Sequence, residues 1–152
     1  MTTKPTHPVE LLACAIATQE GYFSSNPTVT PRARNNPGDL RFASQIGAST
    51  PGWKSPGTPD SPAPIATFDT AAAGVTALFR QVWLQVAKGQ TVRQVISQWA
   101  PPNQNNTSVY LENVLAWTGL PPDTPVLQLL PPLVDLAVSN TPPAGSGRSI
   151  PT

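Results

Sequence analysis

The strongest candidate for chemistry in this chain is a glutamate at the end of an apolar helix pattern. Apolar residues recur at helical spacing on one face before it, at Val9, Leu12, Ala13, Ile16 and Ala17. Glu20 continues that face, and Gly21 ends the helix. Partial burial and the negative end of the helix dipole both disfavour an ionised carboxyl, so the pattern predicts a raised pKa for Glu20. Such a group suits general acid catalysis. The alternative is a helix-end glutamate whose head group reaches solvent.

The chain contains eight acidic residues, so the remaining candidates can be considered in turn. Six of them fit helix starts, caps, outer faces, a proline-rich loop or the C-terminal end: Glu10, Asp60, Asp69, Glu112, Asp123 and Asp135. Asp39 lies in the loop sequence Arg-Asn-Asn-Pro-Gly-Asp-Leu and needs an explanation. Cys14 is predicted to be a small buried residue, and His7 is too isolated for a metal site. An enzyme built on this chain would therefore use one or two carboxylates, without metal or cofactor, and glycosidic cleavage needs little else.

Five helices and a small β-ribbon are expected to position these groups. The first helix is predicted from Pro8 to Gly21, and the second from a cap at Asp69 or Thr70 to Gly89. The third is predicted over 92–99, after a capping box formed by Thr91 and Gln94, and the fourth over 107–118. A short fifth helix is predicted to start at an Asp123 cap, with Pro125 in its first turn, and to end at Leu130. A last turn or two is expected at 133–138. Segments 39–42 and 64–68 are predicted to pair as an antiparallel ribbon flanking a long loop, which contains Trp53 as an anchor or a ligand platform.

The second of these helices is expected to be the central core helix. Its inner face is predicted to carry Val75, Leu78, Phe79, Val82 and Val86, with Trp83 alongside, and its outer face Gln81, Gln85 and Lys88. The fold class that follows is α+β and mostly α-helical, with a small β-ribbon and a long loop.

Length and composition indicate one domain over residues 7–140, with disordered ends at 1–6 and 141–152. A formal net charge of +1 argues against electrostatic capture of nucleic acid. The sequence has no apolar run of transmembrane length and no visible secretory signal. We therefore expect no membrane insertion, and a substrate outside the cytoplasm would require another delivery route.

Several segments, taken in order, resemble the lysozyme-like superfamily of goose-type lysozymes and soluble lytic transglycosylases. The segment Ile-Ala-Thr-Gln-Glu-Gly-Tyr-Phe around Glu20 is similar to the catalytic glutamate segment, and Asn-Asn-Pro-Gly-Asp at 35–39 to an Asn-Asn-Pro-Gly-Asn signature of bacterial and phage members. Ile65 to Phe68 followed by Gly74, and Trp99-Ala-Pro-Pro through to Tyr110, are similar to later segments. The resemblance covers about residues 9 to 127.

This resemblance implies a lysozyme-like domain that cleaves the glycan strand of bacterial peptidoglycan. Glu20 would be the general acid and base, Tyr110 would face it, and Tyr22 would contact substrate. Asn35 and Asn36 would shape the loop beside the cleft and could bond sugar groups, although turn chemistry alone explains asparagine before Pro-Gly. Asp39 could position a water or cap a turn.

The chain departs from the transglycosylase pattern in three places. Gly21 stands where serine usually follows the glutamate, a Gly-Leu-Met-Gln motif is absent, and Asp39 replaces the last asparagine. Hydrolysis and transglycosylation therefore both stay open. Two further alternatives are a non-catalytic carbohydrate-binding or structural component of a phage particle or secretion apparatus, and a chitinase-like hydrolase.

Overall fold

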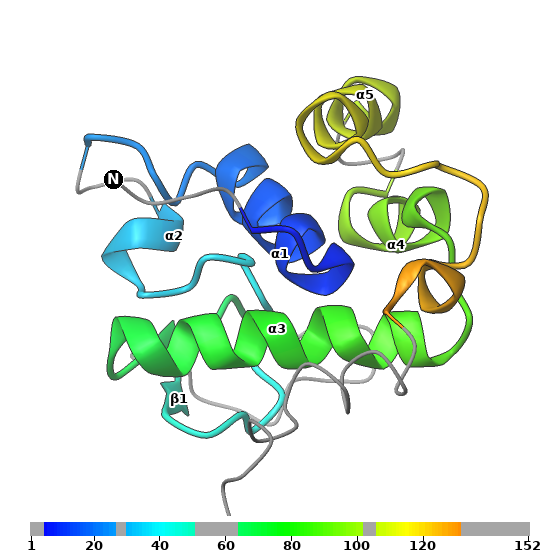
Figure 1. The fold of residues 1–152 in the computed structure, drawn as a ribbon. Coiled ribbons are helices and arrows are strands. Elements are labelled where there is room, and N and C mark those ends of the chain that lie inside the picture. Colours follow the sequence, from blue (N-terminus) through cyan, green and yellow to red (C-terminus); the bar gives the residue numbers. More distant parts are fainter. Residues whose placement is uncertain (1–4, 27–29, 51–63, 102–105, 132–152) are drawn as a thin grey trace, which may run out of the picture.

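The computed structural model describes residues 5–26, 30–50, 64–101 and 106–131. Within them the chain is mostly helical, with a small two-stranded antiparallel sheet. The elements are α1 (Pro8–Gln19), α2 (Thr30–Ala33), β1 (Ala48–Ser49), β2 (Thr67–Phe68), α3 (Ala71–Ala87), α4 (Val92–Trp99), α5 (Thr107–Thr118) and the 3-10 helix η1 (Val126–Leu129). Figure 1 shows α3 as the longest helix, with α1 lying across it and η1 near its C-terminal end.

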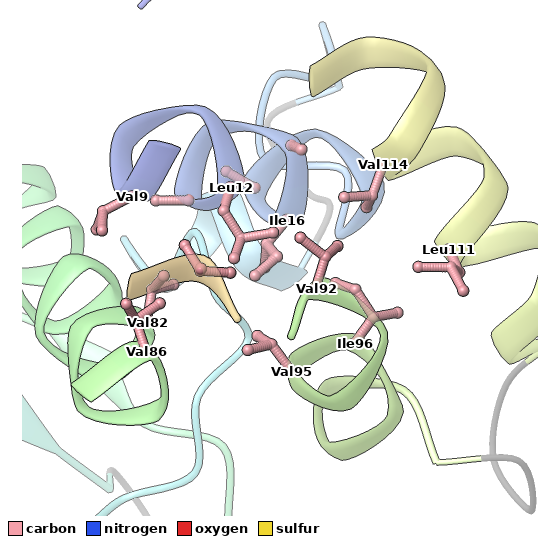
Figure 2. Close-up of a cluster of buried hydrophobic side chains, with 14 of the residues drawn as sticks. Val9, Leu12, Ile16, Val82, Val86, Val92, Val95, Ile96, Leu111 and Val114 are labelled. Atoms are coloured by element: carbon pink, nitrogen blue, oxygen red, sulfur yellow. The ribbon is translucent and has the colours of Figure 1, made fainter. Parts of the chain in front are cut away.

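The hydrophobic core lies where α1 packs against α3, α4 and α5. Leu12 and Ile16 of α1 are fully buried, and so are Val82 of α3 and Ile96 of α4. Figure 2 shows side chains from all four helices pointing toward one another around α1. The predicted inner face of the first helix is confirmed. Core packing along the whole of α1 therefore fixes the position of the C-terminal end of this helix, where Glu20 lies.

Side-chain caps set the starts of the helices as the sequence predicts. Thr70 accepts a hydrogen bond from the Ala73 N–H at the start of α3, and Thr91 and Gln94 form the expected capping box at α4. Asn106 caps α5. At the other end of α5, Gly119 takes the left-handed conformation with φ 71°. His7, predicted to be too isolated for a metal site, caps α1 by accepting from the Val9 N–H.

The β-ribbon is confirmed in its pairing and corrected in its extent. Residues around Arg41 and Ile65 lie antiparallel, through one bridge and two backbone hydrogen bonds, as predicted for 39–42 with 64–68. The regular sheet lies beyond this bridge, where β1 pairs with β2, with Ala48 opposite Phe68 and Ser49 opposite Thr67. β1 was not predicted from the sequence, because two residues cannot show an alternating pattern.

Four local predictions are wrong. The segment after Gly21 contains the one-turn helix α2, too short to show a helical period. Asp123 does not cap a helix, because its carboxylate pairs with the guanidinium of Arg93 at 2.8 Å on the exposed surface. Pro125 is the N-cap of η1 and not a first-turn residue. Cys14, expected to be buried, is half-buried.

The inner face of α3 is rotated from the predicted one. Leu78, Val82 and Val86 are buried as expected, but Gln85 is buried with them at 9 % exposure. Trp83, expected beside the inner face, is 46 % exposed. The buried stripe thus includes positions i+4, i+7 and i+8 from Leu78, which is ordinary helical spacing. As a result, the side chain of Gln85 lies on the buried face of α3.

Within the described parts of the chain, no helix combines the length and apolar character needed to cross a membrane. The predictions for residues 1–4, for Trp53, for the turns at 133–138 and for the end at 141–152 lie outside the described residues.

Candidate functional site

Glu20 is held at the C-terminus of α1 by a helix-ending motif. The Gly21 N–H donates to the Thr18 carbonyl (3.1 Å), and the Tyr22 N–H donates to the Ala17 carbonyl (3.0 Å). These two bonds are the pattern of a Schellman cap, which requires a left-handed residue after the cap position. Gly21 supplies it with φ 85°. Backbone hydrogen bonds between the residues before and after Glu20 therefore fix its backbone conformation.

Two side-chain hydrogen bonds tie this end of α1 to α5. The Tyr110 hydroxyl donates to Oε1 of Glu20 (2.9 Å), and Nδ2 of Asn113 donates to Oε1 of Gln19 (3.0 Å). Tyr110 and Asn113 are three residues apart, so they share one face of α5. The Tyr110 contact predicted by the resemblance is thus present in the structure.

Burial controls the ionisation of Glu20. Loss of hydration raises the pKa of this carboxyl from its ordinary value of 4.5 to about 7, against the lowering effect of the hydrogen bond from Tyr110. The negative charge of Asp39 raises the pKa further. The direction is the one predicted from the helix pattern. Burial and the two nearby carboxylates also raise the pKa of Tyr110 above its ordinary value, so its hydroxyl keeps its proton and remains a donor.

Asn36 organises the loop that carries Asp39. Its side chain is fully buried, and Nδ2 donates to the carbonyls of Leu40 and Ala66, both at 2.9 Å. Its Oδ1 accepts from the Leu40 N–H at 2.8 Å. With these bonds made, the side chain has no exposed surface. These bonds support the turn-chemistry alternative, in which Asn36 joins the loop to the β-ribbon, and a sugar contact of Asn36 stays a prediction.

Close backbone contacts press the same loop onto α3 and α4. A Cβ at Gly74 would lie 1.7 Å from the Asn35 carbonyl oxygen, so only glycine allows α3 to approach the loop. Asn35 has φ 50°, and its Nδ2 donates to the Phe68 carbonyl at 3.1 Å. Nε1 of Trp99 donates to the Gly38 carbonyl at 2.9 Å. The loop is thus a packed part of the structure, and Asn35 serves it through its backbone and a bond to β2.

Asp39 is the second carboxylate of this region. It has φ 49°, and its Oδ1 is buried without a hydrogen-bond partner. Burial raises its pKa, while the positive charges of Arg34 and Arg41 act in the opposite direction. A buried carboxylate oxygen without a partner is unusual, because carboxylates normally accept several hydrogen bonds. It can accept one from a water or from a ligand hydroxyl.

Glu20 and Asp39 line one cleft with a volume of about 490 Å³. The wall also includes Trp99 and Pro101 from the end of α4 and, notably, uncharged amide side chains from the ribbon loop, α3 and α4: Gln45, Gln81, Gln85 and Gln98. The sequence analysis missed these glutamines as site residues. The signal was present, since Gln81 and Gln85 follow Leu78 by three and seven residues, on the core-facing side of α3.

Tyr22 is not among the residues that line this cleft. It packs at the edge of the main core, and its ring meets Phe23 edge-on with centroids 5.4 Å apart. The structure thus gives Tyr22 a packing role, and its substrate contact stays a prediction.

In the described parts of the chain, no group of three or more His, Cys, Asp or Glu side chains is arranged to hold a metal ion. Comparison with protein-family models, with curated proteins and with solved structures finds no match to this chain.

Proposed function

We propose that this protein cleaves the glycan strand of bacterial peptidoglycan, with Glu20 as general acid and base. The observation that carries the proposal is a carboxyl with a pKa of about 7 in a cleft with a second carboxylate, Asp39. Such a carboxyl is about half protonated at neutral pH, so both its acid and its base forms are available. The uncharged amides on the cleft wall are suited to a hydroxyl-rich and acetamido-rich polymer.

The reaction proceeds in two proton transfers through the same residue. Protonated Glu20 donates its proton to the glycosidic oxygen as the bond from that oxygen to the anomeric carbon breaks. The resulting carboxylate then removes a proton from the nucleophile that attacks the anomeric carbon, and this restores protonated Glu20. The hydroxyl of Tyr110 donates to Oε1 and so stabilises and orients the carboxylate between the two steps.

The identity of the nucleophile divides this proposal into two reactions. A water molecule gives hydrolysis and a reducing end, and a 6-hydroxyl of the sugar itself gives an anhydro ring. Asp39 favours hydrolysis, because a second carboxylate in the same cleft can position a water as the nucleophile.

A lysozyme-like fold belongs to the same proposal. The order of elements supports it: an apolar helix ending in the glutamate, then the Asn-Asn-Pro-Gly-Asp loop, a small ribbon, and then a long helix. A protein of this kind acts at the bacterial cell wall. The non-catalytic and chitinase-like alternatives differ from it in measurable products.

The test is digestion of purified peptidoglycan by the wild type, Glu20→Gln and Glu112→Gln, with product ends identified by mass spectrometry. Glu112 is an exposed glutamate on α5 and serves as the matched control. We expect release of fragments by the wild type and by Glu112→Gln, and at least a hundred-fold loss in Glu20→Gln. Binding without cleavage by the wild type would support the non-catalytic alternative. Preferential cleavage of chitin would support the chitinase-like one.

A further inference from the structure

We propose that Gln85 is a glycan-binding residue, whose side-chain Oε1 accepts a hydrogen bond from a hydroxyl or acetamido N–H of the sugar in the cleft. This inference rests on the proposed function, because it assigns a contact for the same substrate. It adds a residue that the resemblance does not name and that the sequence pattern placed on the wrong face of its helix.

The first support is that Gln85 is a polar residue at a buried position, where an apolar side chain is expected. It lies in α3 between Val82 and Val86, which are both fully buried, and it is itself 9 % exposed. Its Oε1 is enclosed and has no hydrogen-bond partner in the protein. An apolar residue at this position would give a more stable fold, because a buried acceptor without a partner loses its hydration and gains nothing in return. Residues that weaken a fold in this way are typical of binding sites.

The second support is the position of this side chain. Gln85 lines the same cleft as Glu20 and Asp39. Asp39 presents the second buried acceptor without a partner, its Oδ1. Two unpartnered acceptors in one cleft call for a ligand that brings hydrogen-bond donors.

The chemistry of the wall narrows the class of donor. Gln81, Gln85 and Gln98 are neutral, and amides of this kind pair with hydroxyl and amide groups without attracting ions. The positive charges of Arg34 and Arg41 already act on Asp39, which disfavours a cationic ligand there. An uncharged donor-rich ligand fits best, and an N-acetylated sugar carries both hydroxyl and N–H donors.

The test compares two methionine variants in the Glu20→Gln background, which allows binding without cleavage. Gln85→Met keeps the length of the side chain and removes the acceptor. Gln90→Met is the matched control, because Gln90 also has a buried Oε1 without a partner but does not line the cleft. The probe is soluble uncrosslinked glycan strands prepared from peptidoglycan, titrated by calorimetry. The Tm of each variant is measured without glycan.

We expect Gln85→Met to weaken glycan binding about 5- to 10-fold, the loss of one hydrogen bond, and to keep or raise the Tm. Gln90→Met should bind like its parent. Equal binding by Gln85→Met and its parent would overturn the assignment while leaving the proposed function intact. A fall in Tm in both Gln85→Met and Gln85→Leu would identify a packing role and would also overturn it. A parent that binds no glycan would remove the proposed function, and this inference with it.

Discussion

Replacing Glu20 with glutamine should make the protein more stable at high pH and leave its stability at low pH nearly unchanged. The folded-state pKa of Glu20 lies above the unfolded-state value, so protonation stabilises the fold. This contribution is fully present below about pH 4.5 and is lost as the pH rises through about 7. Glutamine imitates the protonated carboxyl and carries no charge at any pH, so the loss should be absent from the variant.

The expected size follows from the pKa. A rise from 4.5 to about 7 corresponds to at most about 3 kcal/mol of folding free energy. Part of the carboxyl faces the cleft and is screened by solvent, so we expect about 2 kcal/mol. Glu20→Gln should therefore exceed the wild type by about this amount at pH 8.5, and the difference should approach zero near pH 4.

The assay is urea unfolding followed by circular dichroism at half-unit steps from pH 4 to pH 8.5, with Glu112→Gln as control. The exposed side chain of Glu112 is hydrated in both folded and unfolded chains, so its replacement should give a difference that varies little with pH. A stability difference for Glu20→Gln that stays constant from pH 4 to pH 8.5 would refute the argument that burial controls this carboxyl.

Three further changes test the parts that hold Glu20 and its loop. Tyr110→Phe removes the hydrogen bond that lowers the pKa of Glu20, so the pH at which activity is half-lost on the alkaline side should move upward; a downward move would contradict the assigned geometry. Gly74→Ala places a methyl group 1.7 Å from the Asn35 carbonyl oxygen, so the free energy of unfolding should fall by about 2 kcal/mol or more; unchanged urea unfolding would mean that the loop is not pressed onto α3. Ile16→Thr puts a hydroxyl into a fully buried position and should reduce the free energy of unfolding by about 2 to 4 kcal/mol. Retained stability there would mean that the buried face of α1 is wrongly assigned.

The sequence predicts the helices well, because their starts and stops have local chemical causes. The capping box at Thr91 and Gln94, the cap at Thr70 and the left-handed Gly119 are all visible as residue types at fixed spacing. The direction of the Glu20 pKa also follows from local information, since the helix stripe alone indicates burial.

The parts that the sequence does not predict depend on contacts between distant segments. Asn36 is fixed by the Ala66 carbonyl thirty residues later, and nothing in its own neighbourhood distinguishes that role from sugar binding. Gln85 is a different case, because its helical spacing from Leu78 indicates burial but a polar residue on an apolar stripe was assigned outward by its type alone. Short elements such as β1 and α2 carry too few residues for any periodicity.

The most direct test of the central claim is an NMR titration of the Glu20 side-chain carboxyl carbon in the intact wild-type protein, with Glu20→Gln used to assign the signal. We expect a midpoint of about pH 7, because burial outweighs the hydrogen bond from Tyr110. A midpoint near the ordinary value of 4.5 would contradict it: Glu20 would then be fully ionised at neutral pH and could not act as the acid that begins glycan cleavage.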